Sequence, residues 1–493
     1  MEVRSQEVFD HPVVASRRII RNTFFLSVAD VLNKAMMFVF YFIAARHLGV
    51  EKFGILSFAI AFVTMWSVFA DLGLGIVAAR EIARNREAGR RQVNAALAIK
   101  LVSTVLVVAL IVCVINLLKF PANKVRVVYI CTLFILEAAF TNFFVNVFQG
   151  LEKMHFTTLS RIIQVVVLVA GVIILRHSFP RTENYAWLYV GAGFASAAFA
   201  WGGVYFLIRP QLDFNFKRWW GVLRQALPLG LSVIFVTFYY WNGTTLLAKL
   251  SGDRAVGAYS AAFRIVWGSL FIPLSFSASV YPFFSRLSVS DPQRFVQTVA
   301  RTLRYITVFA LPIGGMGVVL ARAIIMLIYG SAYEPAVLPL MILVWWSVFA
   351  CFSSLFSYYF IAINRPVITT VQSAISLGVN LIANFILIPR FGAVGAALAI
   401  VTAELVGFLF LLWQHFLSPL RMKGGELALV FIRVGGALIL VMATIRLVGL
   451  WNIWVGLGCG IILYITLLFI CRIISRSDFG FILTLAKDRK NGG

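Results

Sequence analysis

The chain has 493 residues, of which 61% are hydrophobic and only 13% are charged, and its mean hydropathy is +0.92. These values exclude an ordinary soluble domain and indicate an integral membrane protein. The formal net charge of +24 does not indicate a nucleic-acid partner, because the basic residues lie in short loops between apolar runs rather than on one face of a soluble domain. The 5 Cys stand singly, without the spacing of metal ligands, so we expect no metal site, no disulfide framework and no cofactor.

Apolar runs long enough to cross a bilayer follow one another along nearly the whole chain. An apolar helix of about 20 residues spans the hydrocarbon core, where only a helix satisfies all of its own backbone hydrogen bonds. The sequence therefore predicts an all-α integral membrane protein with about 14 transmembrane helices. In chain order the predicted spans are residues 24–45, 53–78, 93–117, 127–150, 156–176, 185–208, 225–248, 256–284, 302–329, 336–362, 367–388, 392–416, 427–448 and 452–474.

The basic residues between these spans predict how the chain is oriented. Lys and Arg number roughly 28 on the side of the N-terminus, 12 on the opposite side and 3 within spans, which is the bias expected when the first side is cytoplasmic. We therefore predict cytoplasmic tails over residues 1–23 and 475–493, and no removable signal peptide. Every loop is short, so no separate extramembrane domain is expected.

A weak internal repeat relates the two halves of the chain. At an offset of 203 residues, "AARHLGVEKFGILSFAIAFV" (44–63) and "LAKLSGDRAVGAYSAAFRIV" (247–266) agree at 6 of 20 positions, and at an offset of 212 "FQGLEKMHFTT" (148–158) resembles "FIAINRPVITT" (360–370). Both pairs map one span onto the span six later, so the copies run in the same direction and are expected to be related by a pseudo-twofold axis along the membrane normal. The alternative is that Gly and Ala recur in all membrane helices because they allow close packing.

The repeat predicts two six-helix lobes and an appendage. The N-lobe is expected at 24–208 and the C-lobe at 225–416, joined by a cytoplasmic linker at 209–224. Two extra C-terminal helices are expected within 417–474.

Three stretches resemble a known family: "YFIAARHLGVEKFGILSFAIAFVTMWSVFADLGLGIVAAREIAR" (41–84), "VFQGLEKM" (147–154), and "AVGAYSAAFRI" (255–265) followed by "YPFFSRLS". Their order, spacing and span frame resemble the polysaccharide-transport branch of the multidrug/oligosaccharidyl-lipid/polysaccharide exporter superfamily, of the O-antigen flippase type. The resemblance implies a multi-pass flippase of the bacterial inner membrane that moves a polyprenyl-pyrophosphate-linked oligosaccharide from the inner to the outer leaflet. It further implies alternating access around a cavity walled chiefly by spans 1, 2, 7 and 8. Lipopolysaccharide biosynthesis, with polymerase and chain-length proteins as partners, is part of the same expectation.

Cations inside spans are candidates for binding the substrate's phosphates. A charge at the centre of a span is costly and normally faces a cavity or a partner. Arg264 lies roughly 12 Å from the outer edge of span 8, and Lys34 lies near the middle of span 1 by the same rise per residue. Fixed Arg or Lys can replace the water and counterions that a pyrophosphate leaves behind. The alternative for Arg264 is that its side chain snorkels to the interface.

Three further residues complete the predicted substrate-binding set. Lys249 and Arg46 lie at equivalent ends of spans 7 and 1 and are candidates for receiving the head group, although ordinary interfacial anchoring would place them there as well. Asn242 adds a polar group to span 7, on the helices that the resemblance assigns to the cavity.

Four acids are candidates for ion coupling or gating, with protons or sodium as the coupling ion. Asp30 stands one turn from Lys34, where it either neutralises that cation or offers an acid to a proton. Glu137 and Glu404 lie near the middle of their spans, where a buried carboxyl can exchange protons or simply bond a neighbouring helix. Asp71 is a possible gate residue near the inner interface, with Arg80 or Arg84 as its expected partner.

Two other functions compete with the flippase. A multidrug or cation exporter of the same superfamily would need acidic and aromatic cavity residues, whereas the candidates here include Arg264 and Lys34. An enzyme such as a glycosyltransferase would need a substantial extramembrane loop or paired catalytic carboxylates, and neither is evident, so we expect a transporter and not an enzyme.

Overall fold

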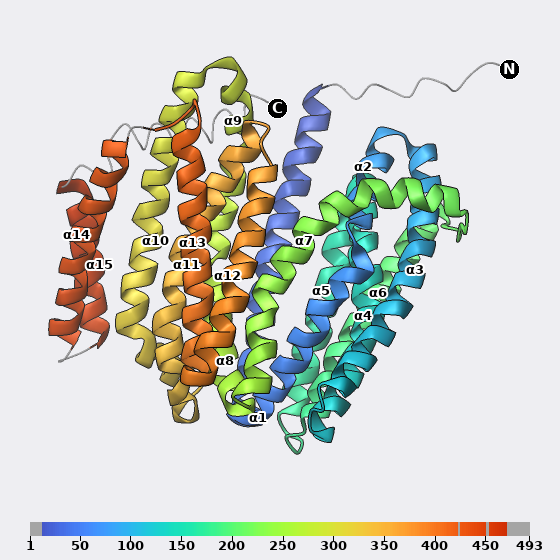
Figure 1. The fold of residues 1–493 in the computed structure, drawn as a ribbon, viewed down its shortest axis with the longest axis horizontal. Coiled ribbons are helices and arrows are strands. Elements are labelled where there is room, and N and C mark those ends of the chain that lie inside the picture. The colour runs from blue at the N-terminus through green and yellow to red at the C-terminus, as the bar shows by residue number, and fades with distance from the viewer. Residues whose placement is uncertain (1–11, 423, 450–452, 471–493) are drawn as a thin grey trace.

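The computed structural model describes residues 12–422, 424–449 and 453–470, and all the regular structure in these ranges is helical (Figure 1). Its elements are α1 (Pro12–Asp71), α2 (Leu74–Arg84), α3 (Arg86–Leu117), α4 (Ala122–Gly150), α5 (Met154–Leu175), α6 (Thr182–Ile208), α7 (Phe216–Leu250), α8 (Asp253–Ser269), α9 (Phe271–Ser290), α10 (Pro292–Ile328), the 3-10 helix η1 (Ser331–Ala336), α11 (Val337–Ala362), α12 (Val367–Phe391), α13 (Ala393–Leu417), α14 (Gly424–Gly449) and α15 (Ile453–Ile470).

The helices follow the predicted frame of spans. Within the described residues, nine helices are long and apolar enough to cross a membrane, or ten if the bent α7 is one span. α1 contains two predicted spans, because Gly49 interrupts it with a φ of 74°, and the predicted eighth span is divided between α8 and α9 at Leu270. The all-helical membrane fold predicted from hydropathy is thereby confirmed.

Two lobes lie side by side (Figure 1). The N-lobe comprises α1–α6 and the C-lobe comprises α7–α13, while α14 and α15 pack on each other and reach the C-lobe through α10. The lobes meet where α1 packs against α7 and α8, and where α2 and α3 contact the first part of α7. We call the end that carries the Gly49 turn the outer end, and the end that carries the α6–α7 linker the inner end, following the charge bias.

The repeat is visible in the backbone. Glu152 after α4 and Asn364 after α11 both adopt positive φ, of 57° and 60°, and they stand at the predicted offset of 212. In each turn the next amide bonds back five residues, Lys153 N to Phe148 O at 2.9 Å and Arg365 N to Phe360 O at 2.8 Å. This six-to-one bond is the helix ending that a left-handed residue permits. The same chain reversal therefore occurs at equivalent places in the two lobes.

Candidate functional site

The outer ends of the two lobes touch through a pair of repeat-related glycines. A Cβ added at Gly54 on α1 would overlap the carbonyl oxygen of Asp253, and one added at Gly257 on α8 would overlap that of Val50. Val50 and Asp253, like the two glycines, stand 203 residues apart, so the contact is symmetric under the repeat. Only glycine lets two backbones approach this closely. The glycines singled out as repeat markers are therefore where one lobe meets the other.

Arg46 and Lys249 lie beside this contact and reach across it. Arg46 of the N-lobe donates from Nε to Ile328 O at 2.7 Å and from Nη2 to Leu327 O at 2.6 Å, both at the end of α10. Lys249 of the C-lobe donates to Leu118 O at 2.7 Å, next to the end of α3. Cations suit helix C-termini because the last carbonyls lack intrahelical partners. Each cation thus holds a helix end of the opposite lobe, and head-group binding by either stays a prediction.

A buried ion pair that was not predicted from the sequence also joins the lobes here. Lys124 at the start of α4 lies 2.5 Å from Asp253 at the start of α8, and both side chains are largely buried. The Phe120 ring lies under Lys124 at 5.3 Å and under Lys249 at 5.2 Å. In the sequence, Lys124 and Asp253 each stand at the end of a loop, and nothing indicates that they pair. The only available signal is the repeat, which makes Asp253 equivalent to Val50, the residue that contacts Gly257. We call these contacts the outer junction: the Gly54–Gly257 approach, the bonds of Arg46 and Lys249 to the opposite lobe, and the Lys124–Asp253 pair.

The inner ends of the lobes meet at a second glycine contact. A Cβ at Gly73 would lie 2.8 Å from Ala226 O, and one at Gly230 would lie 2.6 Å from Leu72 O. Leu72 and Gly73 form a left-handed break between α1 and α2, with φ of 47° and 80°. This break of the N-lobe therefore rests on the bend of α7.

Asp71 immediately precedes that break and is held by a buried cation. It pairs with Lys100 of α3, whose side chain is fully buried and lies 5.5 Å from the centre of the Phe143 ring. The expected pairing of Asp71 with Arg80 or Arg84 is wrong, because both arginines contact Glu81 and Arg80 also reaches Gln225 at 2.6 Å. Lys100 is buried on α3, and its counterion is supplied by the neighbouring helix α1, which sequence spacing cannot indicate.

Arg264 lies at the contact between the lobes. It projects from α8 so that its guanidinium carbon is 3.1 Å from the centre of the Tyr41 ring on α1. Arg264 is half-buried, Tyr41 is 7% exposed, and Arg264 Nε has no hydrogen-bond partner among the described residues. Stacking on an aromatic face holds a guanidinium in place, and here its buried Nε–H is left without an acceptor. Arg264 is therefore a fixed cation at the lobe interface with unused donor capacity.

Lys34 lies on the same side of α1 as Tyr41. The two residues are seven positions apart, which is about two turns or roughly 10 Å along the helix and brings them to one face. Lys34 is exposed in the isolated chain. Its predicted partner Asp30 lies outside the described side chains, so that pairing stays a prediction. Lys34 and Tyr41, on which Arg264 of α8 is stacked, therefore lie on one face of α1 at two depths.

Asn242 is buried inside the C-lobe. Its side chain donates to Asn380 Oδ1 at 2.8 Å and accepts from Asn384 Nδ2 at 2.8 Å, both on α12. The three amides are at most 3% exposed. Asn380 and Asn384 were not singled out in the sequence, although their spacing of four places them on one helix face. The cluster joins α7 to α12, and contact of Asn242 with substrate stays a prediction.

The two candidate acids of the spans are buried, one in each lobe. Glu137 of α4 accepts from Thr141 Oγ1 at 3.1 Å through one oxygen, while its other oxygen lies against Gly193 of α6 and has no donor among the described residues. Glu404 of α13 accepts from the Tyr239 hydroxyl at 2.6 Å, and that hydroxyl accepts from Trp346 Nε1 at 3.1 Å. Each lobe therefore contains one carboxyl that bonds neighbouring groups of its own lobe.

No group of three or more metal-ligating side chains is found in the described part of the chain. Arg264 places a cation at the contact between the two lobes, and the contacts at both ends would have to break if the lobes were to move.

The sequence matches a known family over more than half of its length. The family described as "Polysaccharide biosynthesis protein" matches residues 19–288, and the family described as "MatE" matches residues 228–386. A Haloferax volcanii protein named "Probable low-salt glycan biosynthesis flippase Agl15" is 23% identical over 95% of this chain and 99% of its own length. From the same organism, "Probable flippase AglR" is 31% identical over 34% of this chain and 36% of its own.

Solved structures show the same fold. The structure titled "Lipid II flippase MurJ, inward closed conformation" has a TM-score of 0.74 at 15% identity and covers 90% of this chain and 98% of its own. An inward-facing multidrug resistance MATE family transporter of the same exporter superfamily has a TM-score of 0.63 at 15% identity, over 77% of this chain and 94% of its own. At these identities the likeness concerns the fold alone.

Proposed function

Because the chain belongs to the polysaccharide biosynthesis protein family of the multidrug/oligosaccharidyl-lipid/polysaccharide exporter superfamily, we propose that it is a flippase for a lipid-linked oligosaccharide. The observation that carries the proposal is Arg264, a half-buried cation fixed on Tyr41 between the lobes with a donor unused. A lipid pyrophosphate brings negative charge into an apolar region, and a fixed guanidinium binds phosphate oxygens through two donors at once. The protein moves this substrate between leaflets and is not an enzyme in this proposal.

Arg264 and Lys34 hold the phosphates at two depths in the proposed cycle. Lys34 lies on the same face of α1 as Tyr41, on which Arg264 of α8 is stacked, so a phosphate leaving one cation can meet the other roughly 10 Å away along α1. Handing the charge from one fixed cation to the next avoids leaving it unpaired in a low-dielectric region. The lipid tail can stay in the bilayer during this movement.

Opening of the outer junction completes the cycle. Arg46 and Lys249 now bond carbonyls of the opposite lobe, and separation of the lobes would free both cations. Freed at the outer surface, they can receive the head group that Arg264 releases, as the sequence predicts. The same two cations then close the outer end again when the substrate has left.

The coupling ion is a proton or sodium in this proposal. Glu137 and Glu404 are buried within their lobes. A buried carboxylate without a counterion is less favourable than the protonated carboxyl by several kcal/mol, so gain or loss of a proton changes the energy of the lobe. Asp71 adds a charge beside the inner glycine contact, and Asp30, if it pairs with Lys34, is a further candidate for ion coupling. The acids would make lobe movement depend on the ion.

The cargo and location are proposed from the resemblance. We place the protein in a cell membrane, the bacterial inner membrane in the O-antigen case, with both termini cytoplasmic. A polyprenyl pyrophosphate carries the sugar unit, and polymerase and chain-length proteins of lipopolysaccharide synthesis are the partners. One named relative is a probable flippase of glycan biosynthesis in Haloferax volcanii, so the proposal covers cell-surface glycans in general, of which O-antigen is one.

Deletion of the gene tests the proposal in the cell. We expect the deletion strain to accumulate the complete lipid-linked oligosaccharide on the inner leaflet and to lose the corresponding surface glycan, because synthesis continues while transfer stops. Mass spectrometry of the extracted lipids measures the intermediate. A strain that lacks the intermediate while the surface glycan is lost would point instead to an enzyme of the pathway.

A multidrug or cation exporter is the second candidate, and the match of residues 228–386 to the MatE family favours it. The glutamates Glu137 and Glu404 and the aromatic residues around Trp346 would then serve a cationic drug. The positive charge at the lobe contact argues against this cargo, because Arg264 would repel it. Efflux of organic cations from loaded proteoliposomes distinguishes the two cargoes.

A further inference from the structure

The first part of α7 is a separate amphipathic helix at the inner end of the molecule. Residues Phe216–Pro228 and Gly230–Leu250 are bent by 51° relative to each other. Proline removes a helical hydrogen bond and accounts for a bend at this position. We call Phe216–Pro228 the linker helix. It crosses the ends of α2 and α3 instead of continuing the line of its span (Figure 1).

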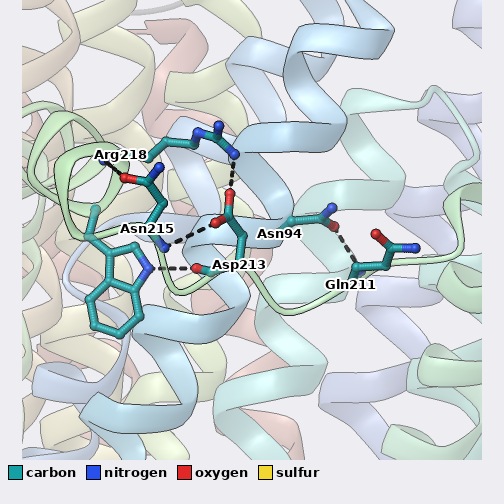
Figure 2. A network of polar contacts seen from close by, with 6 residues as sticks. Asn94, Gln211, Asp213, Asn215 and Arg218 are labelled. Atoms are coloured by element: carbon teal, nitrogen blue, oxygen red, sulfur yellow. Dashed lines mark hydrogen bonds and ion pairs between the residues drawn. The ribbon is translucent and has the colours of Figure 1, made fainter.

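The loop before the linker helix fixes it to the N-lobe (Figure 2). Asn94 of α3 accepts from the Gln211 amide at 2.9 Å through its side chain. Asp213 accepts from the Asn215 amide at 3.0 Å and forms an ion pair with Arg218, and its carbonyl accepts from the Trp219 indole at 2.7 Å. Asn215 caps the helix by accepting from the Arg218 amide at 3.3 Å. This side of the helix is therefore held in one orientation.

The linker helix has one packed face and, beside it, an exposed apolar stripe. At about 100° per residue, Trp219, Val222 and Ala226 share one face, and they pack on the N-lobe. The neighbouring stripe holds the aromatic residues Phe216 and Trp220, which are 74% and 67% exposed. Leu227 extends this stripe and is 45% exposed. A helix with a packed face would be expected to be polar elsewhere, so this apolar stripe needs another partner.

Two cations border the apolar stripe. Lys217 and Arg224 are exposed and lie about 40–100° around the helix from Trp220 and Phe216. In the described residues no ion pair or hydrogen bond is found for either side chain, whereas Arg218 on the far side is neutralised by Asp213. The linker helix contains no acidic residue. Its exposed surface therefore combines large apolar side chains with two uncompensated positive charges.

We infer that the linker helix is an interfacial anchor that binds the head groups of anionic phospholipids at the inner surface. Large aromatic side chains beside cations suit the boundary between acyl chains and head groups, where the rings enter the bilayer and the cations meet phosphates. The helix continues directly into a membrane span, so the surface of that same membrane is within reach. The anchor would hold the α7 bend, on which Leu72 and Gly73 of the N-lobe rest. This inference does not depend on the identity of the cargo.

Hydrogen exchange of the linker helix tests the inference. The full-length protein is placed in nanodiscs of phosphatidylcholine alone, or of phosphatidylcholine with one third phosphatidylglycerol. We expect the anionic lipid to slow exchange in peptides over 216–228 by up to about 30-fold, the factor that two cations near an anionic surface can supply. The effect should be largely lost in K217Q/R224Q.

A matched variant controls for total charge. K153Q/R294Q removes two exposed cations at the same end of the molecule, after α4 and at the start of α10, and should keep the full lipid effect. Unchanged exchange in the peptides of α4–α6 verifies that each variant is folded. Equal exchange in both lipids for the wild type, or an undiminished lipid effect in K217Q/R224Q, would overturn the inference.

Discussion

The cation at position 264 carries a cost for the membrane helix in which it stands. Arg264 is stacked on Tyr41 of the other lobe and leaves a donor unused. Its repeat counterpart is Ala61, so the duplicated scaffold does not require a charge here. A residue that the fold does not need, and that is costly to insert, is best explained by a ligand.

Arg264→Ala should strongly reduce glycan export while the protein still inserts. Loss of a charge-assisted contact to phosphate lowers export about 10- to 100-fold, given the free energy of such hydrogen bonds. Complementation of a deletion strain, read as surface glycan with protein level measured in parallel, checks this. Arg254→Ala, which removes an exposed arginine from the same helix, should export normally. Wild-type export by R264A would contradict the assignment.

Individual charges near the lobe contacts illustrate what sequence alone can and cannot establish. The cost of a charge in an apolar run was enough to single out Arg264, Lys34, Glu137 and Glu404. The ion-pair partners of the charges near the lobe contacts could not be predicted from the sequence. Asp71 pairs with Lys100 of another span, and Lys124 pairs with Asp253 of the other lobe. Both partners are distant in sequence, so neither helical spacing nor local composition indicates the contact.

At the scale of elements, the outer junction combines backbone contact with charge. Gly54 and Gly257 bring α1 and α8 together, and the Lys124–Asp253 pair lies at the same end. The periodicity of the repeat predicted equivalent helix starts at these glycines. It could not predict that the two copies face each other, since identity between copies says nothing about the contact between them.

Gly257→Ala should destabilise the closed outer junction. The new methyl group would overlap the Val50 carbonyl, and a backbone atom cannot rotate away, so we expect a cost to this state of about 1–3 kcal/mol. Spin labels at positions 52 and 254, in a background without Cys, should report a longer distance between the lobes. Gly268→Ala is the control, because nothing lies within 4 Å of its added Cβ. An unchanged distance in G257A would show that the junction does not depend on this contact.

The Lys124–Asp253 pair should behave as a coupled unit. Lys124→Met leaves Asp253 buried without its cation and should lower stability by about 3 kcal/mol, the cost of breaking a buried pair. The double variant K124M/D253N should recover much of the loss, because no uncompensated charge remains. Thermal unfolding in detergent of the wild type, both single variants and the double variant measures the coupling. Additive losses in the double variant would mean that the two side chains act independently.

At the scale of the whole molecule, two lobes touch at both ends, and Arg264 of one lobe is stacked on Tyr41 of the other between them. Hydropathy, charge bias and the repeat predicted the helical frame and the lobes, because each of these signals is written into local sequence. The bend of α7, the break between α1 and α2 and the lobe contacts depend on the packing of distant segments. They therefore became visible only in the structure.

Reconstituted transport tests the central claim most directly. Purified protein in proteoliposomes should move a fluorescent polyprenyl-pyrophosphate-linked oligosaccharide between leaflets, measured as its accessibility to a membrane-impermeant quencher. The account predicts transfer by the wild type and by R254A, strongly reduced transfer by R264A, and no efflux of organic cations by any of them. Absence of oligosaccharide transfer by a folded wild type that does export organic cations would contradict the account.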